Sequence, residues 1–204
     1  MGISKIRRNI GFFFSFLIVS ILLCTGAKGE NPSAMVEEKQ EILIQKAIAM
    51  DEEIKEKLPA SESYGKDPYV QMLDMDWLKI PYSDMYSGYA IEGEELILKL
   101  TKESRDSRYK DIRKQARESA RKHGASKIRY VGYSLNQLHA LYAKASYYAL
   151  NGNDCGIIMA ALDKDSVLIG INENEMNEEK IACAQMLLGN AELLQFAEFS
   201  YKDD

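Results

Sequence analysis

The sequence predicts an α+β fold made of two related small units, each with the element order α-β-β-α-β. Apolar residues alternate with a period of two over residues 96–100 and again over 167–171, which is typical of hairpin strands. The two runs begin 71 residues apart (167 − 96), and each lies between two helical patterns. We expect antiparallel sheets with helices on one face, the C-terminal unit being ferredoxin-like because its order from residue 127 is β-α-β-β-α-β.

The first 27 residues form a predicted signal peptide. Three basic residues precede an uncharged apolar run, Ile10 to Leu23, that is shorter than the roughly 18 to 20 residues of a membrane-spanning helix. Small residues then allow cleavage after Ala27 or after Gly29. We therefore expect a secreted or cell-surface protein without stable membrane insertion after cleavage, an uncleaved anchor being the alternative.

Composition limits the classes of partner. Without the three basic residues of the signal peptide, 23 basic residues face 31 acidic ones, a net charge of about −8. This balance suits a soluble protein and argues against a general binder of nucleic acid or of anionic membranes. After a polar leader at 28–34, the chain is expected to hold an N-terminal α/β unit (35–126) and a C-terminal unit (127–204).

In the N-terminal unit, a helix is predicted from about residue 35 to 58, where Pro59 ends it. The stretch 60–87 reads as an irregular loop rich in aromatic residues, and a connection of that length is usually functional or hides short elements. A hairpin over 88–100 follows. The next helix, about 105–122, ends before Gly124.

A strand over 127–133, which the two units share or which adjoins them both, opens the C-terminal unit. It precedes a helix that starts at Ser134. Gln137 stands three residues later, and together they form a capping box. A second hairpin over 157–171, a helix over about 178–188 and a last strand over 193–199 complete the unit.

Cys155 and Cys183 are the cysteines that remain after signal-peptide removal. Export would permit a disulfide between them, but sequence alone does not bring their Cα atoms within bonding range. We favour two buried thiols that act as small apolar residues, with the disulfide as the alternative.

Three stretches resemble the N-terminal pro-regions of bacterial trypsin-like serine proteases of the alpha-lytic type. Residues Tyr82–Leu98 are similar to the first hairpin of those regions, Val131–Leu138 to the start of a later helix, and Gly156–Ile171 to the second hairpin. The resemblance spans about residues 82–199 and implies a small α/β protein that assists the folding of a protease and inhibits it. The sequence departs from the family pattern in two places. The turn of the second hairpin lacks the asparagines of the family, and the sequence ends at Asp204, where the family continues into a protease.

No catalytic, cofactor or metal site is expected. A serine triad needs a nucleophile, an imidazole and a carboxylate, and the cap explains Ser134 without catalysis. We expect His139 to be solvated. His123 is expected at the C-terminal end of its helix, where a cation interacts favourably with the helix dipole. No CxxC, HExxH or glycine-rich phosphate motif is present, and Asp163 and Asp165 read as a hairpin turn rather than a calcium loop.

Two surfaces are candidates for binding a partner. Between Lys102 and Arg129, eleven basic residues face four acidic ones, so this segment could bind an acidic protein or an anionic wall polymer, the alternative being a solvated helix face. The aromatic stretch could form an interface or pack onto its own sheet. With the C-terminal tail, these surfaces give the following candidate protein-binding residues: Trp77, Tyr82, Tyr86, Tyr89, Arg113, Arg117, Phe199 and Tyr201.

The function expected from these observations is that of a secreted, non-enzymatic binding protein built like a protease pro-region. Its most specific form is an inhibitor or folding helper of an extracellular serine protease. The alternatives are a structural or degenerate cell-surface protein without a protease partner, and a ferredoxin-like ligand-binding module.

Overall fold

The computed structural model describes residues 32–199, with side chains described from residue 37 onward. The chain divides into residues 1–36 and residues 37–204, and the packing below concerns the second part. The predicted signal peptide and the start of the leader lie outside the described residues. In the described part, no helix is long and apolar enough to cross a bilayer.

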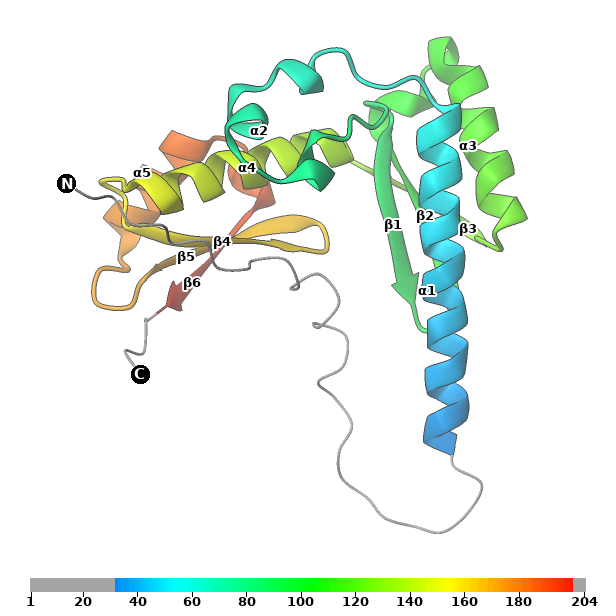
Figure 1. The fold of residues 1–204 in the computed structure, drawn as a ribbon, viewed down its shortest axis with the longest axis horizontal. Helices are drawn as coiled ribbons and strands as arrows, with labels where there is room; N and C mark the ends of the chain where they lie inside the picture. The colour runs from blue at the N-terminus through cyan, green and yellow to red at the C-terminus, as the bar shows by residue number, and fades with distance from the viewer. Residues whose placement is uncertain (1–31, 200–204) are drawn as a thin grey trace, which may run out of the picture. The chain divides into compact units, whose positions relative to one another are not determined.

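The described chain runs twice through the succession helix, hairpin, helix and strand (Figure 1). The first series consists of α1 (Pro32–Lys57), β1 (Tyr86–Glu92), β2 (Glu95–Thr101), α3 (Lys110–Lys122) and β3 (Lys127–Val131). The second series consists of α4 (Leu135–Asn151), β4 (Ile157–Asp163), β5 (Ser166–Asn172), α5 (Glu178–Leu188) and β6 (Leu194–Phe199). The predicted α+β fold with two sheet units is confirmed.

The two sheets have the same topology. Their strand orders are β1-β2-β3 and β4-β5-β6. In each sheet the first two strands are antiparallel, and the third lies parallel to the second. β1 and β2 each begin and end 71 residues before their counterparts β4 and β5. Each hairpin also has a register shift near the start of its first strand. The two series are therefore structural repeats.

Two details of the predicted topology are wrong. The sheets are mixed rather than antiparallel, because a helix connects the second strand to the third and returns the chain in the same direction. The strand at 127–131 pairs with β2, with Ile97 opposite Lys127, so the second sheet has three strands and lacks the fourth strand of a ferredoxin-like sheet. Hydrophobic periodicity identifies a strand but not its partner.

One face of the first sheet packs against both of its helices. Leu96, Leu98 and Leu100 alternate along β2, so all three point to the same side. They are buried together with residues of α1 and α3, which include Met50 and Ala116. Both helices lie on the same face of this sheet, as predicted.

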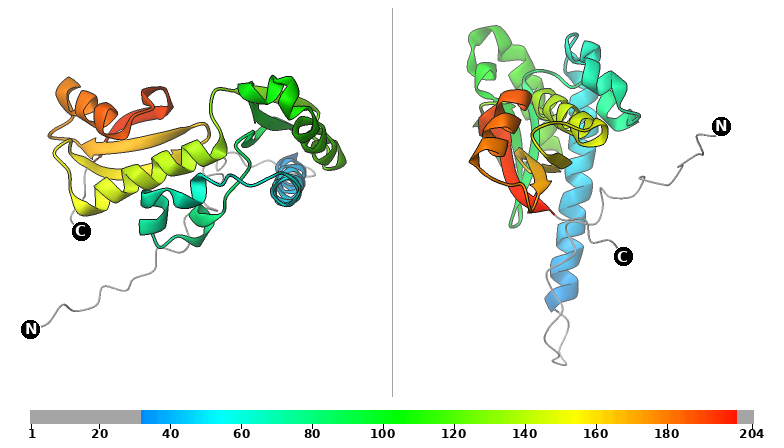
Figure 2. Two further views of the ribbon diagram at one scale, coloured as in Figure 1. Left: turned by 90° about the horizontal axis from the view of Figure 1, so that it is seen from above. Right: turned by 90° about the vertical axis from the view of Figure 1, so that its left-hand side faces the viewer.

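The second sheet repeats this packing with α4 and α5. Val167, Ile169 and Ile171 of β5 are fully buried against residues of both helices, including Leu141 and Ala184. Figures 1 and 2 show α4 running along the length of β4 and β5. The side chains that alternate with these three residues point to the opposite face of the sheet.

The aromatic stretch between α1 and β1 is ordered by short helical elements. α2 (Pro68–Met72) is capped by the Asp67 carboxylate, and single 3₁₀ turns lie on either side of it. Val70 and Leu78 are fully buried in a small cluster that includes Ala143 of α4. The long predicted loop therefore hides short elements and packs onto α4.

The predicted capping box at the start of α4 is present. The Ser134 hydroxyl accepts a hydrogen bond from the Gln137 backbone N–H at 3.2 Å, and the Gln137 side chain accepts one from the Ser134 N–H at 2.8 Å. Because Ser134 is buried, water cannot easily replace the lost partner. We expect Ser134→Ala to lower the free energy of unfolding by about 1 kcal/mol in urea titrations. Ser126→Ala, at an exposed hydroxyl outside any helix, is the matched control, and equal losses in the two variants would contradict the capping role.

Candidate functional site

The face of the second sheet that no described helix covers is the best candidate for a binding surface. Pairing across the strands places these side chains on it: Met159, Ala161, Leu168, Gln195, Ala197 and Phe199. We call this set the open face. None of its members is fully buried, whereas the residues that alternate with them on β5 are. Five of the six are apolar, whereas the face of a sheet that is exposed to water is typically polar.

Gly170 lies at the centre of the open face. A Cβ atom added there would come within 3.0 Å of the Met159 Cβ and 3.3 Å of the Phe199 Cβ. The absence of a side chain lets Met159 and Phe199 approach each other across β5. Together they form a continuous apolar surface that reaches the last described residue of the chain.

β6 is an edge strand of this sheet. The backbone groups on its outer side have no strand partner in the described part of the chain, and such an edge can accept a strand from another protein. Phe199, at the end of β6, is 40% exposed, which makes it one of the large apolar side chains that face solvent. Tyr201, the other candidate in the tail, lies outside the described residues.

The aromatic candidates pack mainly within the protein. Tyr86 is fully buried, so its predicted role as a surface contact is wrong. Tyr82 and Tyr89 are half-buried against the core of the first sheet. Trp77 is half-buried too, with its ring edge-on to His139 at 5.3 Å between centroids. Of the two open interpretations of this stretch, packing within the protein describes these contacts, with Tyr82, Tyr86 and Tyr89 on the core of the first sheet and Trp77 on α4 of the second series.

Tyr82 and Tyr86 meet at a carboxylate that the sequence did not single out. Both hydroxyls donate to Asp51 of α1, the Tyr82 bond measuring 3.0 Å. Burial raises the pKa of Asp51 above its usual value, although the two hydrogen bonds favour the charged form. The pKa of Tyr86 is raised because its ring is buried beside this carboxylate. This arrangement ties β1 to α1 and explains why both tyrosines belong to the core.

His139 is buried, which corrects the expectation of a solvated histidine. Its side chain is 8% exposed and lies between Trp77 and Tyr82. Burial lowers its pKa to about 4, so the imidazole is neutral at physiological pH. The helical periodicity placed His139 opposite the sheet core but could not show that the aromatic stretch covers this side of α4.

His123 lies at the C-terminal end of α3, as the sequence predicted, and there it contacts a carboxylate. Its Nε2 atom is 2.7 Å from Glu53 of α1. Glu53 also accepts hydrogen bonds from Lys122, Lys57 and Ser119. These hydrogen bonds, above all the one from Lys122, hold the pKa of Glu53 well below its usual value. The cluster joins α1 to α3 and has a structural role.

The two arginine candidates belong to the solvent side of α3. Arg117 is exposed and donates to the hydroxyl of Tyr130 at 3.0 Å. Arg113 is half-buried, and its guanidinium donates to the backbone carbonyls of Ser104 and Asp106. α3 packs on the first sheet, whereas the open face belongs to the second sheet, so the candidate residues fall on two separate surfaces (Figure 1).

Cys155 and Cys183 form a disulfide, with their Cα atoms 5.3 Å apart. The preferred interpretation of two free thiols is therefore wrong, and the alternative is correct. The bond ties the segment before β4 to α5, two parts that the sequence leaves 28 residues apart.

A polar cavity of about 580 Å³ lies at the start of α4, near the carboxyl ends of β2 and β3. Asp84 and Asn136 in its wall hydrogen-bond each other at 3.1 Å, and Asn136 also holds both backbone groups of Tyr82. Its polar groups thus serve largely to fix the aromatic stretch to α4. No group of three or more metal-binding side chains occurs among residues that the structure describes.

The sequence missed the open face, although a signal for it was present. Met159 and Ala161 alternate with Ala160 and Leu162, which pack against the core, and Leu168 lies between two buried residues of β5. Strands that are apolar on both sides indicate that both faces are covered by something.

Comparison with known proteins adds no identification: no family model, no curated protein and no solved structure matches this chain.

Proposed function

We propose that this chain is a secreted, non-enzymatic binding protein that recognises another protein through β6 and the open face. The observation that carries the proposal concerns residues 32–199. There an edge strand without a strand partner on its outer side adjoins an apolar sheet face that no helix covers and that ends in the exposed Phe199. An extended segment of a partner can hydrogen-bond to such an edge while its side chains contact the apolar face.

The most specific form of the proposal is an inhibitor or folding helper of an extracellular serine protease. Two of the stretches that resemble protease pro-regions coincide with the β1–β2 and β4–β5 hairpins. In such complexes the C-terminal tail can lie in the cleft of the protease, and here the tail continues directly from the exposed edge strand. This continuity supports a role for β6 and residues 200–204 in partner binding.

The test is a pull-down from the culture medium of the producing cells with the full chain as bait. We expect recovery of a serine protease whose activity falls when the chain is added. Phe199→Asp places a charge at the end of β6 and should weaken binding about tenfold or more, as expected for the loss of an exposed aromatic anchor.

Met186→Asp is the matched control, because Met186 is 83% exposed on α5 and lies away from the open face. It introduces the same charge and should leave binding unchanged. Recovery of no protease by folded wild-type chain would contradict the protease form of the proposal. It would favour a cell-surface protein that has no such partner.

A further inference from the structure

A small groove between α3 and β3 carries a concentration of positive charge. It has a volume of about 250 Å³ and is lined by Arg117, Ala120, Arg121, Ala125, Ser126, Lys127 and Ile128. We call it the arginine groove. Its lining contains three cationic side chains and no carboxylate, although the chain as a whole carries a net charge of −5.

The charges of the groove are largely uncompensated. Within the described residues, no carboxylate lies within ion-pair distance of Arg117 or Arg121, whereas Lys127 is paired with Glu95. By contrast, Arg108 and Arg129 nearby each form a two-pronged pair with a carboxylate, and that pairing raises both of their pKa values. The arginines therefore fall into a neutralised set and a free set.

Neutral groups hold Arg117 of the groove and two neighbouring arginines, Arg105 and Arg113, in place. The Tyr130 hydroxyl accepts a hydrogen bond from Arg117. The guanidinium of Arg105 lies over the ring of Tyr130, 4.2 Å from its centroid, in a cation–π contact. Arg113 is anchored by two backbone carbonyls. These contacts reduce the entropy that the side chains would lose on binding an anion, and they leave the positive charge available.

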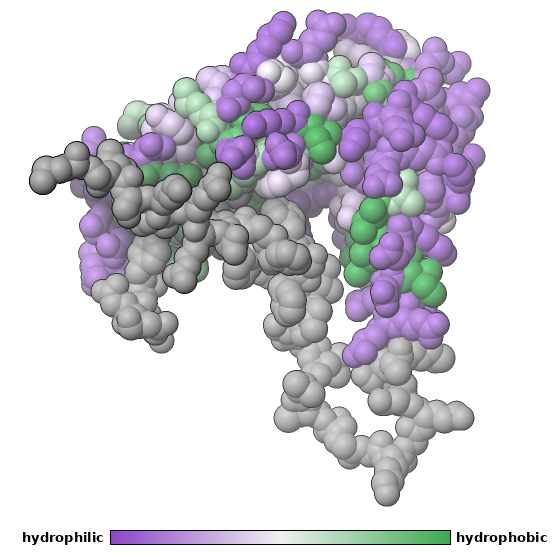
Figure 3. Space-filling model, in the orientation of Figure 1, coloured by the Kyte–Doolittle hydropathy of each residue, from purple (hydrophilic) through white to green (hydrophobic). Residues whose placement is uncertain are grey.

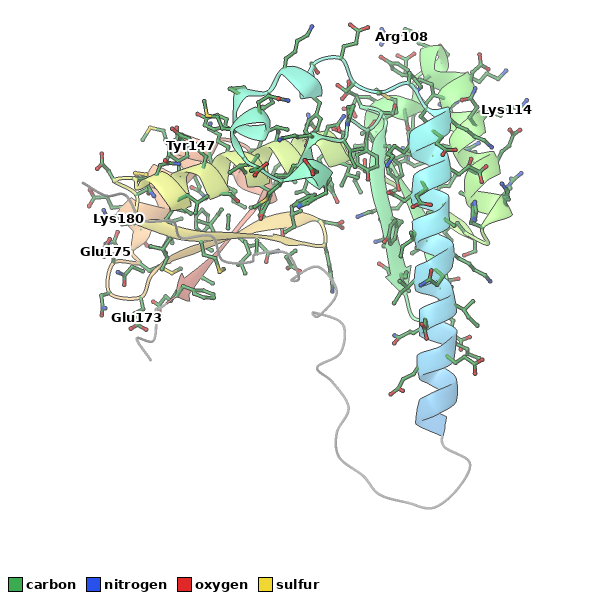
Figure 4. All side chains as sticks on the ribbon, in the orientation of Figure 1. Arg108, Lys114, Tyr147, Glu173, Glu175 and Lys180 are labelled. Atoms are coloured by element: carbon green, nitrogen blue, oxygen red, sulfur yellow. A yellow bond between two sulfur atoms is a disulfide. The ribbon has the colours of Figure 1, made fainter. Side chains whose placement is uncertain are left out.

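The positive charge continues along α3 as a stripe. Lys110, Lys114, Arg117 and Arg121 follow at intervals of three or four residues, which places them on one side of the helix over roughly 17 Å. Figure 3 shows hydrophilic residues gathered over this part of the molecule, and Figure 4 shows Lys114 projecting outward from α3. Asp111 and Glu118 border the stripe, and Glu118 pairs with Lys114 at 3.9 Å. Among the described residues, Lys110, Arg117 and Arg121 have no carboxylate within ion-pair distance, so they supply the free positive charge of the stripe.

We propose that the arginine groove binds phosphate groups and that the stripe on α3 follows an extended phosphate polymer. Planar guanidinium groups match the geometry of phosphate oxygens, and the small groove suits one such group at a time. The negative charge elsewhere on the chain confines a polyanion to this side. Recognition of single-stranded nucleic acid is disfavoured because Arg105 covers the ring of Tyr130, the aromatic surface on which a base would stack.

The experiment measures the binding of fluorescently labelled linear polyphosphate to the full chain by anisotropy over a series of salt concentrations. Arg117→Gln should weaken binding about tenfold and lower the slope of log affinity against log salt by about one. Arg108→Gln removes the same charge from a residue that Asp106 already neutralises, and it should change affinity less than about twofold. Tyr130→Phe keeps all charges but releases Arg117, and a loss of about threefold is expected.

Urea unfolding of each variant establishes that it is folded before its affinity is compared. Equal weakening by Arg117→Gln and Arg108→Gln would overturn the proposal, since it would show a response to bulk charge alone. So would competition by inorganic phosphate as strong as that by polyphosphate at the same phosphate concentration, or tighter binding of single-stranded DNA of equal charge. The proposal is independent of the protease partner, whose recovery by Arg117→Gln chain should match that by wild type.

Discussion

Replacing Cys155 and Cys183 together by alanine should lower the free energy of unfolding by about 3.5 kcal/mol. The disulfide closes a loop of 28 residues, and the loss of chain entropy that this closure imposes on the unfolded state has about that size. The bond also lies at the end of the second core, where Cys155 is buried. Urea unfolding of the oxidised wild type and of the double variant measures the difference.

Reduced wild-type protein is the matched control for the disulfide. It keeps both side chains and removes only the bond, so it should lie close to the double variant in stability. Rapid labelling of both cysteines by a thiol reagent in non-reduced, unfolded protein would show that the bond is absent and would contradict the prediction. A bond of this kind persists in oxidising compartments, which supports the proposed export of the chain.

The hairpins and the repeat could be predicted from sequence because they depend on local patterns. Alternating leucines fix which side of β2 faces the core, and the 71-residue offset between Leu96 and Val167 recurs at every end of the hairpin strands. The Ser134 cap is similarly local, since its two partners are three residues apart. Each of these features requires only residues that are neighbours in the chain or across one turn.

The contacts that were missed depend on segments far apart in sequence. His139 is buried because Trp77, more than sixty residues earlier, packs against it. The cysteines meet only once α5 lies beside the segment before β4, and β3 joins the first sheet only because α3 returns the chain there. Of the candidate binding residues, Phe199 was identified by its place in the tail, but its neighbours on the open face were not.

The turn at 163–165 also makes a contact with a segment far away in the sequence. From sequence it was a solvated hairpin turn. In the structure Asp165 forms an ion pair with Lys99 of β2, which joins the second hairpin to the first sheet. The Lys99 side chain is 5% exposed and that of Asp165 is 46% exposed. A buried ammonium therefore depends on a carboxylate from the other repeat.

Asp165→Ala should lower the free energy of unfolding by about 2 to 3 kcal/mol. Breaking a fully buried pair costs about 3 to 5 kcal/mol because the remaining charge is left without a partner, and the partial exposure of Asp165 reduces that cost. Lys99→Met combined with Asp165→Ala removes the stranded charge and should recover most of the loss. Glu94→Ala, which breaks the exposed pair with Lys39, is the control and should cost less than about 1 kcal/mol. No recovery in the double variant would contradict the explanation by a stranded charge.

The pH dependence of the Asp165 variant separates this ion pair from ordinary packing. Burial is the strongest single influence on the pKa of Asp165 and raises it. The hydrogen bond and positive charge of Lys99, together with the other polar and charged groups nearby, outweigh burial, so the pKa lies below its usual value. A carboxyl whose pKa is lower in the folded state stabilises the protein above its unfolded pKa, and that stabilisation is lost as the pH falls through the folded value. The difference between wild type and Asp165→Ala should thus be constant near neutral pH and shrink below about pH 4. A packing defect would instead leave the same difference at every pH, so urea unfolding at neutral and acidic pH distinguishes the two causes.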